Sequence, residues 1–164
     1  MNHAYTAGII DGEGSVMIIQ RRTPTISVTN SSKPIIDYLH NYYGGLVKVQ
    51  TKYKEHHKQC WIWTLKGDKV ITFLRQVVPH MLETNKVERS KIIINEWKNK
   101  TPRNGKYSPQ QLIEKNEMID RFLAWGWTGL DSVQGVWLKP AWISKQQMQI
   151  TLYPLGGLPL LFEQ

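Results

Sequence analysis

The chain has 164 residues, of which 41% are hydrophobic, and its 21 Lys and Arg residues against 13 Asp and Glu residues give a net charge of +8. This length and composition fit one domain with a packed core and exclude wholesale disorder, while the single cysteine excludes a disulfide framework and a cysteine-cluster zinc site. The basic charge favours a polyanionic partner, although a solvated basic surface accounts for the charge alone equally well.

Short helices and strands are predicted to alternate along the first 125 residues. Apolar–polar alternation indicates strands, apolar residues three and four apart indicate helices, and Pro and Gly mark the ends. The elements expected, in chain order, are a helix over 3–11, strands over 15–22 and 25–29, a helix over 34–42, strands over 46–52 and 60–65, and helices over 68–77, 85–97 and 109–123. Beyond Trp125 the pattern fades, so we expect a domain over 1–125 and a C-terminal extension of unknown structure over 126–164.

Alternation along the strands divides their residues between two faces. In the strand over 46–52, Val47 and Val49 share one face, and the other face carries Lys48, Gln50 and Lys52. In the fourth strand, Trp61 and Trp63 share a face with Leu65. Such an aromatic pair can stack on nucleic-acid bases, but packing against the helices is the favoured interpretation.

Residues 6–14 combine small, acidic and glycine residues at the end of the first predicted helix. Ala7 and Gly8 lack bulk, which permits another helix to approach closely. Asp11 lies near the negative end of its own helix dipole and therefore needs hydrogen-bond donors. Glu13 follows beside unpaired carbonyl groups, and this set of oxygens suits a hard cation. An ordinary amphipathic helix with a glycine cap is the alternative, and for such a turn alone it is the commoner outcome.

The same segment resembles the LAGLIDADG motif of homing endonucleases. The positions that match it letter for letter are Ala7, Gly8, Ile10, Asp11 and Gly14. Ile9 and Glu13 are conservative replacements, whereas Thr6 and Gly12 depart from the motif. The predicted α-β-β-α-β-β-α order is also that family's core. The resemblance covers residues 1–125 and implies an α+β fold with a four-stranded antiparallel saddle sheet and C-terminal helices.

The resemblance further implies a metal site shared between two motif helices. In the family, the last acidic residue of each motif binds divalent metal over the scissile phosphates. Here that residue is Glu13, with the carbonyl of Gly12 beside it, and the cofactor is Mg²⁺ or Mn²⁺. Because the chain holds one such motif, a homodimer is implied. The small residues and the acid that would form its interface are Ala4, Ala7, Gly8 and Asp11.

Two further catalytic residues are carried over from the resemblance. The family places a polar residue after the second strand to orient water, and Asn30 matches it; an ordinary strand-ending turn is an equal alternative. The family also places a basic residue near the start of a later helix, after a proline. Lys86 matches that residue, although its spacing from Pro79 is longer than usual and a surface lysine is the alternative.

The polar faces of the strands are predicted to contact the DNA major groove, with lysine suited to guanine or phosphate and glutamine to adenine. Plain solvent exposure is the alternative for any one of them. The predicted contact residues are Arg21, Arg22, Thr25, Ser27, Lys48, Gln50 and Lys52.

These features predict a metal-dependent homing endonuclease that cuts both strands of a long, pseudo-palindromic double-stranded DNA target. The alternatives are a non-cleaving binder on the same fold, such as an intron RNA maturase or a regulator, and a basic protein-interaction module. No apolar run reaches the roughly 20 residues of a membrane span, and the first residues do not resemble a secretory signal. We therefore expect an intracellular protein, in the cytoplasm or an organelle, with no membrane partner.

Overall fold

The computed structural model describes residues 2–52, 54–102 and 105–125. The C-terminal extension predicted over residues 126–164 lies outside the described residues. The elements in chain order are α1 (His3–Glu13), β1 (Gly14–Ile19), β2 (Thr23–Asn30), α2 (Lys33–Tyr43), β3 (Leu46–Val49), β4 (Trp61–Lys66), α3 (Asp68–Val77), the 3₁₀ turn η1 (Val78–His80), α4 (Thr84–Glu96) and α5 (Pro109–Ala124). The predicted order of helices and strands is confirmed, with η1 as the one addition among the described residues.

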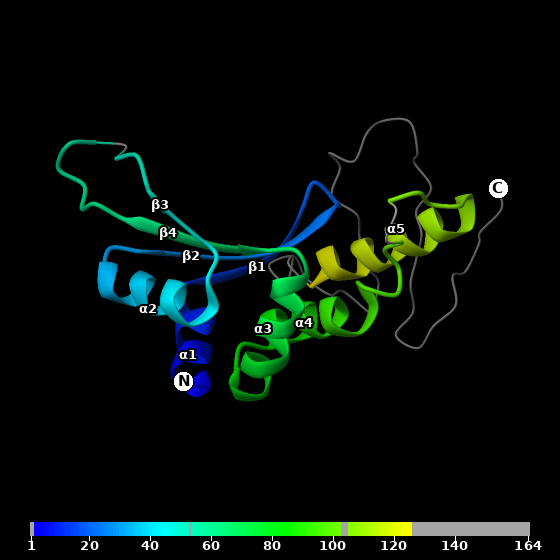
Figure 1. Cartoon of the computed structure of the whole chain (residues 1–164), viewed down its shortest axis with the longest axis horizontal. Coiled ribbons are helices and arrows are strands. Elements are labelled where there is room, and N and C mark those ends of the chain that lie inside the picture. The colour runs from blue at the N-terminus through cyan, green and yellow to red at the C-terminus, as the bar shows by residue number, and fades with distance from the viewer. Residues whose placement is uncertain (1, 53, 103–104, 126–164) are drawn as a thin grey trace, which may run out of the picture. The chain divides into compact units, whose positions relative to one another are not determined.

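The strands form one antiparallel sheet in the order β1-β2-β4-β3. Helices α1, α2 and α3 pack on one side of this sheet, as Figure 1 shows. The predicted α+β fold class is therefore confirmed. None of the helices among the described residues is long and apolar enough to cross a membrane.

The core lies between the sheet and the helices, and the strands supply it in the predicted alternation. The fully or almost fully buried strand residues are Val16, Ile26, Val28, Trp63 and Leu65. Trp63 packs near Phe73 of α3, and its indole N–H donates to the carbonyl of Gly44 at 2.6 Å. The prediction that Trp63 packs in the core is confirmed, because a buried indole needs both apolar neighbours and a hydrogen-bond acceptor.

Three strands differ in length from the prediction. β1 ends at Ile19, three residues before the expected end. β3 ends at Val49, so Gln50 and Lys52 lie beyond the strand, although the backbone N–H of Gln50 still donates to Cys60 at 2.9 Å. β2 begins at Thr23 and includes Pro24, two residues before the start expected at Thr25. Pro24 is tolerated because it lies at the first end of the strand, where its missing N–H costs little pairing.

Candidate functional site

The end of α1 is tied to the segment before α4 through Asp11. Its carboxylate accepts hydrogen bonds from the backbone N–H groups of Leu82 at 2.8 Å and Glu83 at 3.3 Å. These donors resolve the unfavourable position of a carboxylate at the negative end of a helix dipole. Asp11 therefore acts as a structural link within its own chain.

Lys86 makes the reciprocal contact from α4 to α1. Its ammonium group donates to the carbonyl oxygens of Ile10 at 3.0 Å and Asp11 at 2.6 Å, in the last turn of α1. Glu83 caps α4 by accepting from the backbone N–H groups of Asn85 and Lys86. A cation on the unpaired carbonyls of a helix end is favourable, so Lys86 helps to hold the end of α1 in place. Its predicted catalytic role stays a prediction.

Glu13 is the last residue of α1, and its side chain is exposed. Its carboxylate forms no hydrogen bond or ion pair with any residue of ranges 2–52, 54–102 and 105–125. The preceding Gly12 is also exposed, and a Cβ atom added to it would meet no atom within 4 Å. No group of three His, Cys, Asp or Glu side chains within the described part of the chain could hold a metal ion. One chain thus offers a single free carboxylate at this position.

The last glycine of the motif has a steric role. Gly14 follows Glu13 as the first residue of β1, and an added Cβ atom would lie 2.7 Å from both the Cα and carbonyl oxygen of Ile10. Only glycine lets the chain leave α1 and enter β1 so close to the preceding helical turn. Gly14 therefore fixes the point at which Glu13 leaves the helix.

One face of α1 has no partner among the described residues. Ala4, Gly8 and Gly12 are exposed along it, and an added Cβ atom at Gly8 would meet nothing within 4 Å. Ala7, predicted to share this face, is instead 0% exposed and belongs to the chain's own core. The structure corrects this placement. Successive residues of an α-helix point about 100° apart, so Ala7 points about 100° away from Gly8, the middle residue of this face, and toward the core.

Asn30 ends β2, and its side-chain oxygen accepts a hydrogen bond from the backbone N–H of Ser32 at 2.7 Å. This hydrogen bond forms the strand-ending turn that the sequence predicted as the alternative to a catalytic role for Asn30. β1 begins at Gly14, which pairs with Val28, so Asn30 lies two residues beyond that pair. The catalytic role of Asn30 stays a prediction.

The sheet face opposite the core, which we call the open face, carries three of the seven predicted DNA contacts, Thr25, Ser27 and Lys48. The strand residues that alternation assigns to it are Ser15, Met17, Ile19, Thr23, Thr25, Ser27, Thr29, Leu46, Lys48, Ile62, Thr64 and Lys66. Lys48 is exposed there, as predicted. Lys66 is exposed on the same face and was missed, although the two-residue step from Ile62 and Thr64 indicates it.

Two of the predicted contact residues on the central strand are less accessible. Thr25 is 0% exposed and its hydroxyl group donates to the carbonyl of Thr23 at 3.3 Å, so the structure corrects its assignment as a groove contact. Thr25 lies between cross-strand neighbours Met17 and Lys66, and short side chains on a central strand lie deep between longer neighbours. Ser27 is half-buried, and its hydroxyl group donates to the carbonyl of Trp63 at 3.4 Å.

Comparison with known proteins identifies the fold. No protein-family model matches the chain, and no curated protein matches it. Two crystal structures of the homing endonuclease I-CvuI match with a TM-score of 0.57, at 17% and 18% identity, covering 75% of this chain and 80% of I-CvuI. One is a complex with the I-CreI target in the presence of Mg in which the DNA is not cleaved, and the other is a complex with its own target in the presence of Ca. The archaeal intron-encoded homing endonuclease I-Vdi141I, in complex with DNA, matches at 16% identity over 79% of this chain and 87% of that one, with a TM-score of 0.49.

The chain has the LAGLIDADG homing endonuclease fold. In this homing endonuclease fold, α1 is the helix that carries the motif-like residues 6–14, and the described part of the chain places its acidic end beside the N-terminus of α4. At 17% and 18% identity, the matches establish the fold, and the activity has to be argued from this chain's own residues.

Within the homing endonuclease fold, the tip of the β1–β2 hairpin contacts α5. Gln20 and Arg21 form the turn with positive φ angles of 50° and 56°. The guanidinium group of Arg21 pairs with the carboxylate of Asp120 at 3.0 Å and donates to the side chain of Asn116 at 3.3 Å. Arg21, predicted to contact DNA, therefore has partners within the chain, whereas Arg22 is exposed.

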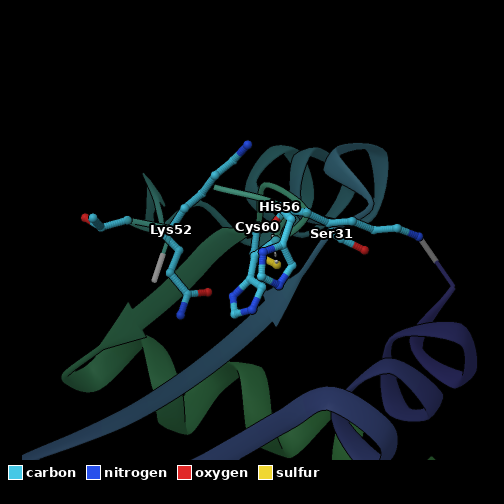
Figure 2. A pocket seen from close by; sticks show the side chains of 8 residues that line it. Ser31, Lys52, His56 and Cys60 are labelled. Carbon is cyan, nitrogen blue, oxygen red and sulfur yellow. Dashed lines mark hydrogen bonds between the residues drawn. The ribbon is translucent and has the colours of Figure 1, made fainter. Parts of the chain in front are cut away.

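A basic hollow lies where the sheet meets the loop between β3 and β4 (Figure 2). Figure 2 shows side chains from both ends of this loop and from the end of β2 around it. The lining residues are Ser31, Gln50, Thr51, Lys52, His56, His57, Lys58 and Cys60. Gln50 and Lys52, both predicted DNA contacts, thus lie together at one end of the sheet.

Proposed function

We propose that the protein is a single-motif member of the LAGLIDADG homing endonucleases that cleaves both strands of a pseudo-palindromic double-stranded DNA target as a homodimer. One observation carries the proposal: the exposed and unpaired Glu13 carboxylate at the end of α1, next to the unpartnered face of Ala4, Gly8 and Gly12. The fold, shared with homing endonucleases, supports it.

The homodimer follows from the number of carboxylates. Hydrolysis of one phosphodiester bond in each strand needs an acidic site for each, and each chain offers one Glu13. Because Gly8 and Gly12 have open space around them, the α1 helices of two copies can approach closely about a two-fold axis. Such an isologous contact brings both Glu13 side chains to the same end of the helix pair.

The residues at this end fit a hard divalent cation, Mg²⁺ or Mn²⁺. The donor set is an exposed carboxylate from Glu13 and a backbone carbonyl from Gly12, both oxygen ligands, with nothing covering Gly12. When bound, such a cation polarises the scissile phosphate and lowers the pKa of attacking water. Lys86 and Asp11 hold the end of α1 in position. Asn30, the last residue of β2, supplies a polar side chain.

The exposed basic residues on the sheet side are suited to phosphate contacts. Lys48 and Lys66 project from the open face, and Arg22 lies at the exposed hairpin tip. Together with Lys52 at the basic hollow, they place positive charge along the path that a duplex on this sheet would follow.

The test is Glu13→Gln, which removes the charge and keeps the side-chain size. Cleavage and binding are measured separately on a target assembled from the DNA that flanks the gene. We expect DNA binding to persist while cleavage with Mg²⁺ falls by at least about a hundredfold, because a metal-assisted step contributes several kcal/mol. Glu117→Gln, an exposed acid on α5, is the matched control and should cut at the wild-type rate.

Three outcomes would contradict the proposal. Wild-type cleavage by Glu13→Gln would remove the catalytic role of Glu13. A chain that stays monomeric on DNA and still cuts both strands would remove the homodimer. Tighter binding to structured RNA than to duplex DNA, with no cleavage by the wild-type chain, would identify the non-cleaving binder instead.

A further inference from the structure

The open face has an unusual chemical composition for a surface that reads DNA. Among the described strand residues assigned to it, two are charged, Lys48 and Lys66, and none is Arg, Asn, Gln, Asp or Glu. Hydroxyl-bearing residues occupy most of the other positions. The remaining positions are apolar and are held by Met17, Ile19, Leu46 and Ile62.

These four apolar side chains do not belong to the core. The core and the side chains packed against it include Ile18 and Val47, from the opposite face of the same strands, but none of the four. Leu46 is 52% exposed and Ile19 is 38% exposed, while Met17 and Ile62 are half-buried. They are thus available to an apolar group on a partner that lies on the open face.

The charge of the face selects the class of partner. The open face carries lysines and no carboxylate among the described residues, so it attracts a polyanion. In the major groove, guanine is read by Arg or Lys, adenine by Asn or Gln, and cytosine by Asp or Glu, whereas thymine alone presents an apolar methyl group. Apolar side chains interspersed with two lysines therefore match thymine better than any other base.

We propose that the open face recognises thymine methyl groups, so that the target half-sites carry T·A pairs opposite Ile62, Leu46 and Met17. This inference rests on the proposed function, since it names the substrate of the same DNA-binding surface. The lysines contact phosphate or guanine at the positions between, and the hydroxyl-bearing residues accommodate the intervening pairs. Ile62 is central to the argument because it pairs across the sheet with both Thr29 and Lys48.

The experiment selects duplexes that the full-length chain binds from a random-sequence library, in the absence of divalent metal. Thymine should be enriched at symmetric positions in both half-sites. Each enriched thymine is then replaced by uracil, which keeps every hydrogen-bonding group and removes the methyl group alone. We expect affinity to fall about fourfold for each contacted methyl group, and about fifteenfold when both half-sites are changed, as for loss of one buried methyl group per contact.

Matched variants assign the effect to the open face. With Ile62→Ser, uracil in place of the thymine opposite residue 62 should no longer weaken binding, while uracil at the other enriched positions should still do so. Lys48→Ala should bind every target more weakly and keep the preference for thymine at all positions. Thermal melting of each variant by circular dichroism confirms that the sheet is retained. If Ile62→Ser does not fold, Leu46→Ser, at an exposed position of the edge strand, makes the same comparison.

The outcomes separate this inference from the proposed function. Selected half-sites without thymine, or affinities that change less than twofold with uracil at every position, overturn the inference and leave the endonuclease proposal standing. Equal affinity for an RNA duplex of the same sequence also overturns it, because that duplex has no methyl groups. If no duplex is enriched and the chain cuts no DNA, both proposals fail.

Discussion

The two ends of α4 hold lysine side chains in opposite ways. At the N-terminal end, Lys86 donates to the carbonyl oxygens of Ile10 and Asp11 in α1. The nearby Glu13 side chain stays exposed. Beyond the C-terminal end, Lys115 of α5 is 3% exposed, with its ammonium group 3.0 Å from the ring centroid of Trp97 and bonded to the hydroxyl group of Thr101. The first junction is built from groups that satisfy one another at the surface, and the second buries a cation against an aromatic ring.

The surroundings of Lys86 stabilise a charged ammonium group better than those of Lys115. Helix-end carbonyls carry partial negative charge and stabilise a cation. An aromatic ring and a hydroxyl group offer less, so burial lowers the pKa of Lys115 to about 8. A similar arrangement recurs elsewhere between α4 and α5, where the guanidinium group of Arg89 lies 4.3 Å from the ring centroid of Phe122, and burial lowers the pKa of Arg89 as well. We therefore expect changes near α1 to affect cleavage first and changes between α4 and α5 to affect stability.

The largest effect is expected from Gly8→Leu on the exposed face of α1. The Cβ atom of a residue placed here meets no atom within 4 Å among the described residues, so the monomer should keep its secondary structure and melting temperature. In the proposed homodimer, two α1 helices that carry leucine here cannot approach closely, and a displacement of an ångström or more at the two Glu13 side chains should reduce cleavage by about a hundredfold. Sedimentation and cleavage assays check both. A dimer that still cuts would contradict the prediction.

Gly14→Ala should damage the same region through the fold. The added Cβ atom lies 2.7 Å from the backbone of Ile10, which cannot move without distorting α1. We expect a loss of about 2–4 kcal/mol in the free energy of unfolding, measured with urea. Gly12→Ala, with open space around its Cβ atom, is the matched control for stability and should unfold within about 1 kcal/mol of the wild type.

Asp11→Ala tests the link between α1 and the segment before α4. It leaves the N–H groups of Leu82 and Glu83 without their acceptor, which should cost about 1–3 kcal/mol of stability. Cleavage should fall more than binding, because the end of α1 loses one of its attachments. Asp37→Ala, which removes an exposed pair with Lys33 at 2.6 Å, should change stability by less than about 1 kcal/mol. Equal losses of stability from the two changes would show that the hydrogen bonds of Asp11 stabilise the chain no more than an exposed ion pair does.

The smallest effect is a pH dependence from Lys115. Because its pKa is about 8 in the folded chain and 10.5 for an unperturbed lysine, the unfolded chain binds more protons between these values. Stability should therefore rise with pH across this range, by about 1 kcal/mol between pH 7 and 9. Lys115→Met should remove this rise relative to the wild type, as measured by urea unfolding at both pH values. An unchanged pH dependence would show that Lys115 keeps its ordinary pKa.

Much of the fold could be predicted because its signals are local. Alternation places Trp63 and Leu65 in the core, and the spacing of glycines marks the end of α1 and α2. The exposed carboxylate of Glu13 could also be anticipated, since a residue after the last helical turn has few neighbours. Lys66 could have been found by extending the same alternation by one step.

Other features could not be predicted because they depend on contacts between distant residues. Helical spacing puts Ala7 near Gly8, but only the packing of α1 on the sheet shows that Ala7 is buried and Gly8 exposed. Thr25 has the polar character of a groove contact, but its burial follows from its place between Met17 and Lys66. The periodicity of a helix or strand indicates which residues share a face. It does not indicate which of these residues the side chains of neighbouring elements cover.

The sequence by itself determined the order of elements, the two faces of each strand and the acidic end of the motif helix, because periodicity and turn chemistry act over a few residues. Only the tertiary structure decided the partners of the charged groups. Arg21 pairs with Asp120, 99 residues away, and Lys86 reaches back 75 residues to the carbonyl of Asp11. Such pairings are set by how the helices pack on the sheet and on one another. Glu13 is left free because Lys86 donates to the carbonyl oxygens of Ile10 and Asp11, and the backbone N–H of Leu82 donates to the carboxylate of Asp11.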